Sequence, residues 1–575
     1  MVSVGSGPLV QLSRGIEVVG NTVWVVGEET PPHSVYSEQI GSVSVFRPRA
    51  SREIELRIQA EQHLKDIYEV GRYADRDIIN EILQHQYGFF TDLLEQTLPT
   101  IASLDLLEFL LAEYEKTTRI ERLYKENDLD EHDRERWADL GPVVRRAIKY
   151  LSERTVMLAP EESLEMPGED ALELIERACI GAEELVRHYL LSDQTFMIFP
   201  DDTILEIHPE GSHHYWTLEL DDQCATRLQE RTRLDTMQRD RFVPGGSFDL
   251  NVQDHDRLLG RAFEETLGIS YLQALGVLRA VIEGAELPRQ GFPIPFVHRE
   301  RTLELLSSQL GLPRLSIEQV LSGFLISQSC LTTEGREIWK PKQEYRALRR
   351  GIFEVEHSTG THWMFSKAMA RECVLQLVGG VVFRDLPLEW RSEQVSSGLD
   401  ALSNRAGKWF EQVVLNSFEA VGAPGVGSQR NGIGQGSARI LIPPNVGEID
   451  YMGYSATENL LVLAECKMVR GGFEPRYFRD DISEFAGGRD SYFEKFQRKV
   501  NWVRDDVNTV CRALASVRRF GGAVTPTHLA TAIITLYPTI ASCLASEAPC
   551  VTLTEIMTGY EEKGHWPCQE GVYPC

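Results

Sequence analysis

Residues 447–454 read Gly-Glu-Ile-Asp-Tyr-Met-Gly-Tyr, and residues 460–467 read Leu-Leu-Val-Leu-Ala-Glu-Cys-Lys. The first stretch alternates in polarity at its start, and the second opens with an apolar run; both patterns are typical of strands that face a core. The residues between them, Ala-Thr-Glu-Asn at 456–459, have the composition of a turn. We therefore predict a β-hairpin whose second strand is buried and ends in charge.

Period-two alternation assigns the polar residues of this hairpin to faces. Successive side chains of a strand point to opposite sides of a sheet. Glu448 and Asp450 therefore share one face, and Glu465 shares a face with Lys467, whereas Cys466 points to the other side. The hairpin is expected to present Asp450, Glu465 and Lys467 together at one edge of the sheet.

Two carboxylates and a lysine at the end of an apolar strand indicate a catalytic site. Ionised groups beside a core must be paired or solvated, so they are rarely placed there for stability alone. Carboxylate oxygens are the ligands that Mg²⁺ prefers. A bound cation lowers the pKa of a water molecule and neutralises charge that grows on a phosphate. A lysine can position that water or stabilise the transition state as a point charge. The trio therefore predicts metal-dependent hydrolysis of a phosphodiester.

The flanking sequence predicts helices on either side of the hairpin. Residues 404–420 have apolar residues at helical spacing, and Glu411 lies on this helix. Residues 493–517 form a second amphipathic pattern, and residues 529–536 read as the next core strand. The order helix, strand, strand, helix, strand predicts an α/β domain with a central mixed sheet.

This order, with its Glu-x-Lys strand end and the upstream aspartate, resembles the PD-(D/E)XK nuclease superfamily, which has the restriction-endonuclease-like fold. The resemblance covers about residues 401–540. It implies that Asp450 and Glu465 bind a metal ion, that Lys467 is the catalytic lysine, that the main-chain carbonyl of Cys466 is a further ligand, and that Glu411 is the carboxylate of the first helix. It also implies Mg²⁺ or Mn²⁺ as cofactor.

One position departs from the pattern, because Ile449 stands where a proline would precede the aspartate. Two alternatives remain open: a buried ion pair in an unrelated α/β domain, and a nuclease fold that has lost its activity. On the helical segment that follows, Lys499 or Gln497 could reach the site and bind nucleic acid, or both could be solvated.

The remainder of the chain predicts a multidomain α+β protein whose N-terminal part is largely helical with small β elements. By pattern the regions are a β-hairpin region (1–50), a helical domain (51–190), a small β region (191–255), a second helical domain (256–400) and the nuclease-like domain (401–575). In the first region the hairpin comprises residues 16–19 and 22–26. In the small β region three short strands are expected, at 196–199, 203–208 and 215–220.

A basic stretch lies within the second helical domain, at residues 336–350. It follows a helix pair and precedes a second hairpin at 352–365, an order that would suit a winged helix. Arg346, Arg349 and Arg350 are then candidates for contacts with nucleic acid. The alternative is an ordinary helical scaffold with a charged face.

Charge is distributed unevenly along the chain. The net charge is −27, from 59 Lys and Arg against 86 Asp and Glu. Residues 401–575 contain 17 basic and 19 acidic residues, so residues 1–400 carry the remaining 42 and 67, a balance of −25. Because acidic surfaces repel phosphate, nucleic acid is assigned to the last third, and the N-terminal part to regulation, a protein partner or self-association.

Targeting and cysteine patterns bear on the location of the protein rather than on its reaction. No apolar run has the length of a membrane span, and no export signal is visible at the N-terminus, so a cytoplasmic protein without a membrane partner is expected. The ten cysteines read as reduced thiols; zinc at the C-terminal group Cys543, Cys550, His565, Cys568 and Cys575 is an alternative.

The sequence thus predicts a Mg²⁺-dependent nuclease acting on DNA, with RNA as an alternative substrate. An endonuclease is expected rather than an exonuclease. A restriction or antiviral phage-defence setting follows only by analogy with the fold. The rival function is a non-catalytic scaffold that binds nucleic acid or protein through a nuclease-like fold.

Overall fold

The computed structural model describes residues 22–24 and 34–575, except for residues 165, 167, 194–202, 211, 213, 220–222, 244–247, 249–250, 286–293, 335–343, 472–474, 518–519, 521 and 545–547. The chain forms two compact units. Unit 1 comprises Met1–Leu220, Leu259–Val378 and Leu386–Val395, and unit 2 comprises Asp221–Leu258, Gly379–Asp385 and Ser396–Cys575. The strands predicted at 16–19 and 196–199 lie outside the described residues.

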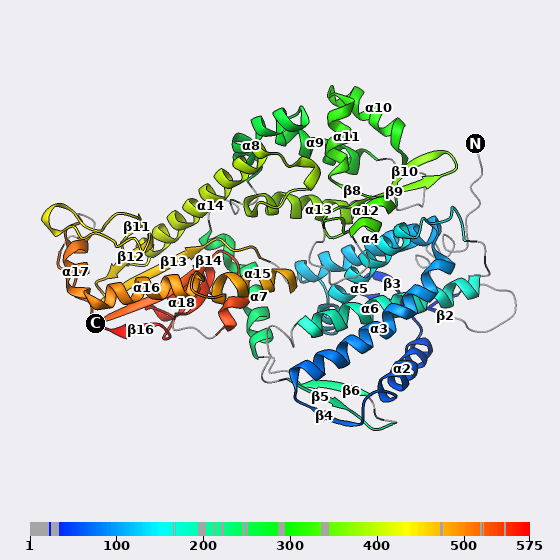
Figure 1. Ribbon diagram of the computed structural model, residues 1–575, viewed down its shortest axis with the longest axis horizontal. Helices are drawn as coiled ribbons and strands as arrows, with labels where there is room; N and C mark the ends of the chain where they lie inside the picture. The colour runs from blue at the N-terminus through cyan, green and yellow to red at the C-terminus, as the bar shows by residue number, and fades with distance from the viewer. Residues whose placement is uncertain are drawn as a thin grey trace. The chain divides into compact units, whose positions relative to one another are not determined.

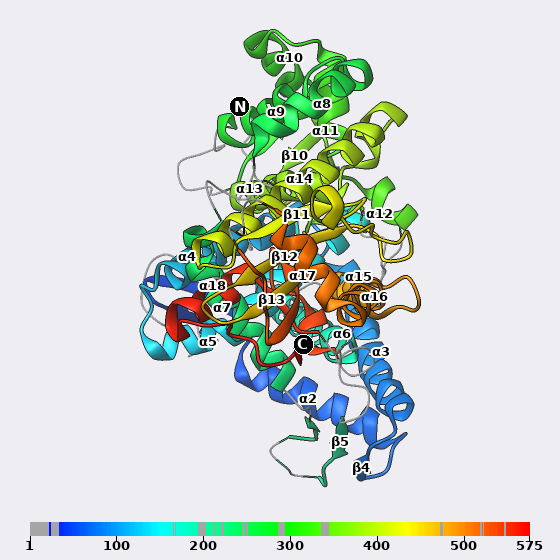
Figure 2. The same cartoon turned by 90° about the vertical axis from the view of Figure 1, so that its left-hand side faces the viewer.

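Unit 1 is built on long helices, as the sequence predicts. They are α2 (Ala50–Lys65), α3 (Arg76–Ile101), α4 (Leu104–Glu126), α5 (Glu131–Met157) and α6 (Gly168–Asp193). Helix α6 packs against α3 and α5 (Figure 1, Figure 2). Side-chain caps fix three of their N-termini, because Asp75, Ser103 and Asp130 each accept a hydrogen bond from a main-chain N–H in the first turn.

Two small sheets of three strands accompany these helices. One has the order β1 (Thr22–Trp24), β2 (Ser34–Ile40), β3 (Val43–Arg47), and the other has the order β4 (Gly71–Tyr73), β5 (Ile204–Ile207), β6 (Trp216–Glu219). In its described residues, the region predicted as β at 191–255 supplies the strands β5 and β6. Its second half forms α7 (Gln223–Phe242) and the start of α8 (Val252–Leu267).

The rest of unit 1 contains the helix pair and hairpin predicted from the sequence. Helices α9 (Tyr271–Gly284), α10 (Arg299–Leu310), α11 (Arg314–Ser322) and α12 (Gln328–Glu334) accompany a sheet of order β7-β10-β9-β8. Its strands are β7 (Phe296–His298), β8 (Leu325–Ile326), β9 (Ile352–His357) and β10 (Gly360–Met364). Helix α13 (Lys367–Gly380) follows.

A mixed sheet forms the centre of unit 2 (Figure 1). Its order is β11 (Gly425–Gln429), β12 (Ile449–Ser455), β13 (Leu460–Lys467), β14 (His528–Thr535), β15 (Cys550–Thr552), and β16 (Val572–Pro574) also pairs with β14. The predicted hairpin is confirmed, because β12 and β13 pair antiparallel with Tyr451 opposite Ala464. Strand β14 runs parallel to β13, which is the topology that a helical crossover permits.

Helices cover both faces of this sheet. One apolar core joins residues of α14 (Glu393–Ala420) and α18 (Leu553–Lys563) to the sheet, and α7 packs on α18. The other core joins α16 (Tyr492–Asp505) and α17 (Val507–Ala515) to the opposite face, and α15 (Pro475–Ala486) packs against α16.

Two boundaries differ from the sequence prediction. The predicted helix 493–517 is interrupted at Asp506, whose backbone is not helical (φ −143°, ψ 52°) and whose side chain caps α17 by accepting from the main-chain N–H of Thr509. The boundary predicted at residue 401 falls inside α14, because that helix begins at Glu393. Among the described residues, no helix has the length and hydropathy that crossing a bilayer requires.

Candidate active site

Strands β12 and β13 place the predicted trio on one face of the sheet. Leu461 and Leu463 of β13 pack into the core beneath α16, whereas Val462 and Cys466 pack into the core beneath α14. Glu465 and Lys467 have the parity of Leu461, so they lie on the α16 face. Asp450 lies there too, because Met452, two residues further along β12, belongs to the same core.

Direct contacts join the three side chains. Lys467 Nζ lies 2.7 Å from Glu465 Oε1 and 3.9 Å from Asp450 Oδ2. The main-chain N–H of Cys466 donates to Asp450 Oδ2 at 2.9 Å. Asp450 and Glu465 are 7% and 5% exposed. The geometry predicted from alternation is therefore present, and both carboxylates are removed from bulk water.

A second lysine reaches the site from α16. Lys499 Nζ donates to the other carboxylate oxygen of Glu465, and its side chain is as buried as that of Glu465. Gln497 instead donates to Asn501 on its own helix, at 3.2 Å. Of the two helix residues considered from the sequence, Lys499 is the one at the site, and it is not solvated.

Burial and mutual repulsion govern the protonation of the two carboxylates. Burial first, and then the charge of Glu465, raise the pKa of Asp450 to about 7. Burial opposes ionisation of Glu465 as well, but Lys467 and Lys499 outweigh it and hold the pKa of Glu465 below its ordinary value. Burial favours the neutral form of Lys467, yet Glu465 and Asp450 raise its pKa well above the usual value.

The raised pKa of Asp450 predicts that Asp450→Asn stabilises the protein when no metal ion is present. An aspartate in the unfolded chain has a pKa of about 3.9, so from about pH 4 to 7 the folded chain holds a proton that the unfolded chain has lost. Ionisation of buried Asp450 therefore lowers the free energy of unfolding. This loss is absent below about pH 4, grows between pH 4 and 7, and is complete above pH 7. Asparagine removes this loss and can still accept from Cys466.

Urea unfolding in the presence of a chelator at pH 5 and pH 8 measures this effect. We expect the variant to exceed the wild type by about 1–3 kcal/mol at pH 8, with a smaller gain at pH 5. A variant that is less stable than the wild type at pH 8 would contradict this prediction, because it would show that neighbouring groups stabilise the buried carboxylate.

One further side chain next to Lys467, that of Tyr492, was not predicted. Lys467 Nζ lies 4.9 Å from the centre of the Tyr492 ring, and the Tyr492 hydroxyl donates to Glu484 Oε2 at 3.1 Å. Such a cation–π contact helps to hold an ammonium group in place. In the sequence Tyr492 only marks the start of an amphipathic helix, which gives no sign of this contact.

Glu411 is not joined to the trio by a direct contact. It lies on α14, which covers the opposite face of the sheet, and its carboxylate accepts a hydrogen bond from the Ser428 hydroxyl. Burial, and then repulsion from Glu448, raise its pKa. The charges of Lys467 and Glu465 also act on this pKa, so Glu411 interacts with the trio electrostatically without touching it.

The donors present suit a hard divalent cation in type, although they do not form a closed cage. Among the described residues, no three His, Cys, Asp or Glu side chains come together as a metal site, either here or at the C-terminal cysteines. Of these cysteines, Cys543 is disulfide-bonded rather than reduced.

Asp450 and Glu465 offer carboxylate oxygens to a cation. A cation bound between them would relieve the mutual repulsion of these two buried carboxylates. Mg²⁺ characteristically binds one or two carboxylates and keeps several waters.

The three arginines of the basic stretch, Arg346, Arg349 and Arg350, are paired with carboxylates in this fold. Arg350 is 1% exposed and is paired with Glu389 at 2.9 Å and Glu344 at 3.3 Å. Arg346 is buried and lies 3.1 Å from Glu153, and Arg349 pairs with Glu344 at 3.3 Å. These pairings favour the scaffold interpretation over a winged helix that uses these arginines, while residues 336–342 lie outside the described residues.

Comparison with known proteins adds no constraint: no family model matches the chain, and no match was found among curated proteins or solved structures.

Proposed function

We propose that unit 2 is a metal-dependent nuclease domain of the PD-(D/E)XK type, which hydrolyses phosphodiester bonds of DNA with Mg²⁺ or Mn²⁺. The observation that carries the proposal is the pair of buried carboxylates, Asp450 and Glu465, on adjacent strands with Lys467 within 3.9 Å of both. The sheet order and the helix on each face support it, since they agree with the order that the resemblance implies.

Each residue of the site has a definite part in such a reaction. Asp450, Glu465 and the Cys466 carbonyl would hold the cation, which supplies an activated water and charge neutralisation when bound. Despite burial, Glu465 and Asp450 raise the pKa of Lys467, which favours the charged form of this lysine. It acts as a point charge and hydrogen-bond donor toward the scissile phosphate. Tyr492 holds the ammonium group laterally.

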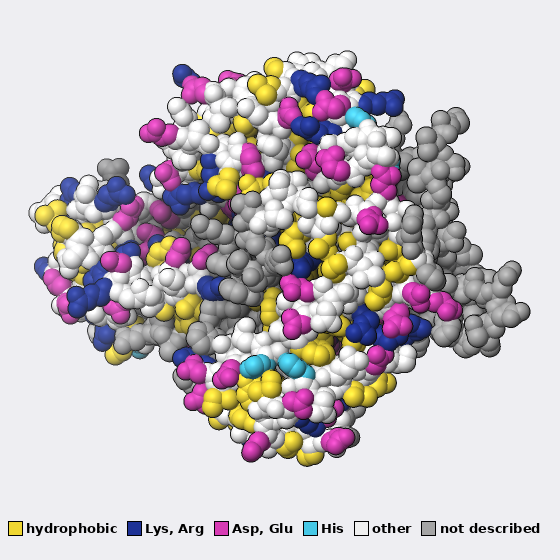
Figure 3. Space-filling model, turned by 45° about the vertical axis from the view of Figure 1, so that its right-hand side comes forward, with side chains coloured by type: hydrophobic (Ala, Val, Ile, Leu, Met, Phe, Trp, Pro, Cys, Tyr) yellow, Lys and Arg dark blue, Asp and Glu magenta, His cyan; other side chains and the backbone are white. Residues whose placement is uncertain are grey.

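The rival proposal is a domain that binds but does not cleave. It is favoured by one feature of the site: Lys467 and Lys499 already neutralise Glu465. In that case the ion pairs would be structural, and nucleic acid or a protein partner would bind elsewhere. Unit 1 would hold regulatory or partner-binding surfaces under either proposal. Figure 3 shows one face of the molecule, on which acidic and basic side chains are interspersed.

The decisive experiment incubates the full-length protein with supercoiled plasmid, linear duplex, single-stranded DNA and RNA, with Mg²⁺, with Mn²⁺ or with a chelator. We expect metal-dependent nicking or linearisation of the plasmid, which an exonuclease cannot produce. Asp450→Asn should abolish it, and the exposed Asp505→Asn on α16 serves as the matched control. Cleavage by Asp450→Asn at the rate of the control variant would contradict the assignment of Asp450 to the active site, and cleavage of RNA alone would change the substrate.

A further inference from the structure

The Glu465 carboxylate of unit 2 contacts two ammonium groups, one at each oxygen. Lys467 Nζ lies 2.7 Å from Oε1, and Lys499 Nζ donates to Oε2. The side chains of Glu465 and Lys499 are each 7% exposed, so the second pair is sheltered from water. The carboxylate that the proposed function assigns to a cation is therefore already paired at both oxygens.

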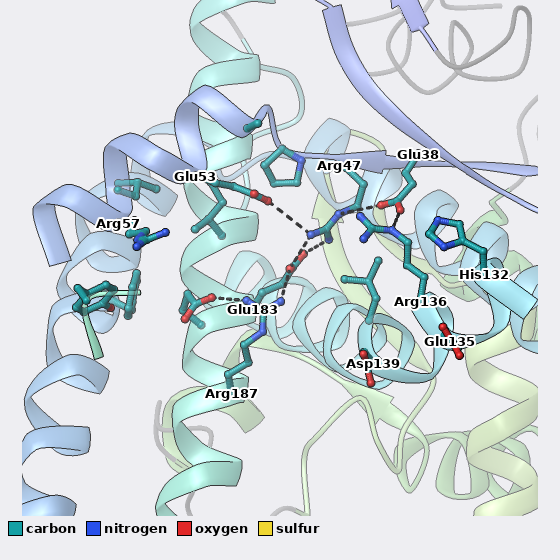
Figure 4. A pocket seen from close by; sticks show the side chains of 18 residues that line it. Glu38, Arg47, Glu53, Arg57, His132, Glu135, Arg136, Asp139, Glu183 and Arg187 are labelled. Atoms are coloured by element: carbon teal, nitrogen blue, oxygen red, sulfur yellow. Dashed lines mark hydrogen bonds and ion pairs between the residues drawn. The ribbon is translucent and has the colours of Figure 1, made fainter. Parts of the chain in front are cut away.

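A buried ion pair of unit 1 shows the opposite balance. There Arg47 donates to both carboxylate oxygens of Glu183, at 2.5 and 3.1 Å (Figure 4). Its guanidinium group also lies 3.8 Å from Glu38 and 3.7 Å from Glu53. In unit 1 one cation is thus shared by three carboxylates, whereas Glu465 alone contacts two cations. One lysine is enough to neutralise Glu465, so the second lysine needs another explanation.

The two lysines have different surroundings. Lys467 ends strand β13 and lies 3.9 Å from Asp450 and 4.9 Å from the centre of the Tyr492 ring, as well as beside Glu465. Lys499 comes from α16, and within the described part of the chain Glu465 is the one carboxylate at ion-pair distance from it. Lys467 is therefore placed to act on both carboxylates and on a substrate, and Lys499 is placed to act on Glu465.

The packing of α16 holds Lys499 at this position. Phe496, Val500 and Val503 belong to the core between this helix and the sheet. Lys499 is three residues after Phe496 and four before Val503, so it lies on the same face of the helix. An ammonium group on a face that packs against a core needs a counter-charge. The pair with Glu465 is thus built into the packing of the helix.

The charges of the four side chains cancel. Asp450 and Glu465 bring two negative charges when ionised, and Lys467 and Lys499 bring two positive ones. Mg²⁺ and Mn²⁺ bind carboxylates through their oxygens, so a cation at Glu465 meets an ammonium group that holds the same carboxylate. Repulsion between charges a few Å apart and sheltered from water is large compared with a tenfold change in affinity.

We propose that Lys499 is a built-in counter-ion, which competes with the divalent cation for Glu465 and keeps the metal affinity of the site low. This proposal rests on the proposed function, because it concerns the cation of that reaction. Lys499 is a positioning residue, since it acts on the cation through Glu465 and not on the substrate. A pair that only holds α16 on the sheet would leave the metal affinity unchanged when Lys499 is replaced.

Titration of the full-length protein with Mn²⁺ alone, without nucleic acid, tests the proposal. The electron paramagnetic resonance signal of free Mn²⁺ reports how much of the ion is bound. We expect Lys499→Met, which replaces the ammonium by an apolar group of similar size, to tighten Mn²⁺ binding at the site by at least about tenfold. Asp450→Asn identifies this site among the other acidic groups of a chain with a net charge of −27, because binding at the site is lost in that variant.

Matched variants separate a local effect from a general effect of charge. Lys495→Met removes the same charge from an exposed position on the same helix and should change the affinity by less than about twofold. Lys499→Met leaves Glu465 paired with Lys467, so we expect it to fold, which circular dichroism checks. Lys499→Gln is a second variant, because its amide can still donate to Glu465 without the charge. It should also tighten binding.

The outcomes distinguish failure of this proposal from failure of the proposed function. Suppose that Asp450→Asn abolishes a Mn²⁺ site whose affinity is unchanged or lower in both Lys499 variants. The cation site then stands, and the counter-ion role of Lys499 is overturned. An equal gain in Lys495→Met and Lys499→Met would overturn it too, because the charge would then act diffusely. If neither the wild type nor a Lys499 variant has a Mn²⁺ site that depends on Asp450, the proposed function itself fails, and this proposal fails with it.

Discussion

Lys467→Ala is expected to lower the rate of DNA cleavage by about 10²–10³-fold while the protein stays folded. The side chain brings a permanent positive charge within 2.7 Å of Glu465 and 3.9 Å of Asp450. Its loss removes charge stabilisation in a site that is largely shielded from water, and such groups supply several kcal/mol, or roughly 10²–10³-fold for each donor. Glu465→Gln should be equally severe, because it removes a carboxylate that would hold the cation.

Matched variants separate chemistry from folding in this series. Lys495→Ala removes an exposed lysine from the same unit and should leave cleavage unchanged. Glu411→Gln should be milder than any change in the trio, since the Glu411 carboxylate accepts from Ser428 and has no direct contact with Asp450, Glu465 or Lys467. Undiminished cleavage by a well-folded Lys467→Ala protein would contradict the assignment of the active site and favour a structural ion pair.

Local patterns were enough to predict the centre of unit 2. The period-two alternation around Asp450 and the apolar run before Glu465 fix both strands and the face of each side chain, because a strand has a single side-chain period. The contact of Lys499 with Glu465 could not be fixed in this way. It depends on how α16 is rotated on the sheet, which is set by the packing of Phe496, Val500 and Val503 in the core.

Non-local pairing explains what the sequence did not predict. Strand β4, at Gly71–Tyr73, joins β5 and β6 from more than a hundred residues upstream, so no local window contains that sheet. Helix α7 belongs to unit 2, where the Asp235 carboxylate accepts from the Thr554 hydroxyl on α18. Contacts between distant segments also decide the role of Arg350, whose charge suggests an exposed surface although its partners bury it.

Arg350→Ala is accordingly expected to destabilise unit 1 by about 3–5 kcal/mol, the usual cost of removing one partner from a buried ion pair. Its guanidinium donates to Glu389 at 2.9 and 3.1 Å and to the carbonyl oxygens of Ser322 and Glu344, each at 2.9 Å. Alanine would remove the guanidinium that pairs with the partly buried Glu389, would leave Glu344 paired with Arg349, and would leave these carbonyls without this donor. Urea unfolding followed by tryptophan fluorescence measures the loss, since Trp390 lies in the same region.

The exposed Arg301→Ala on α10 is the control and should stay within about 0.5 kcal/mol of the wild type. The same variants distinguish a structural role from contact with nucleic acid. A phosphate contact contributes about one unit to the slope of log affinity against log salt, so a structural Arg350 predicts no change in slope at a temperature where the variant is still folded. A variant with wild-type stability and a flatter salt dependence would instead show that Arg350 contacts nucleic acid. In that case Arg350 would have to leave its ion pairs with Glu344 and Glu389 on binding.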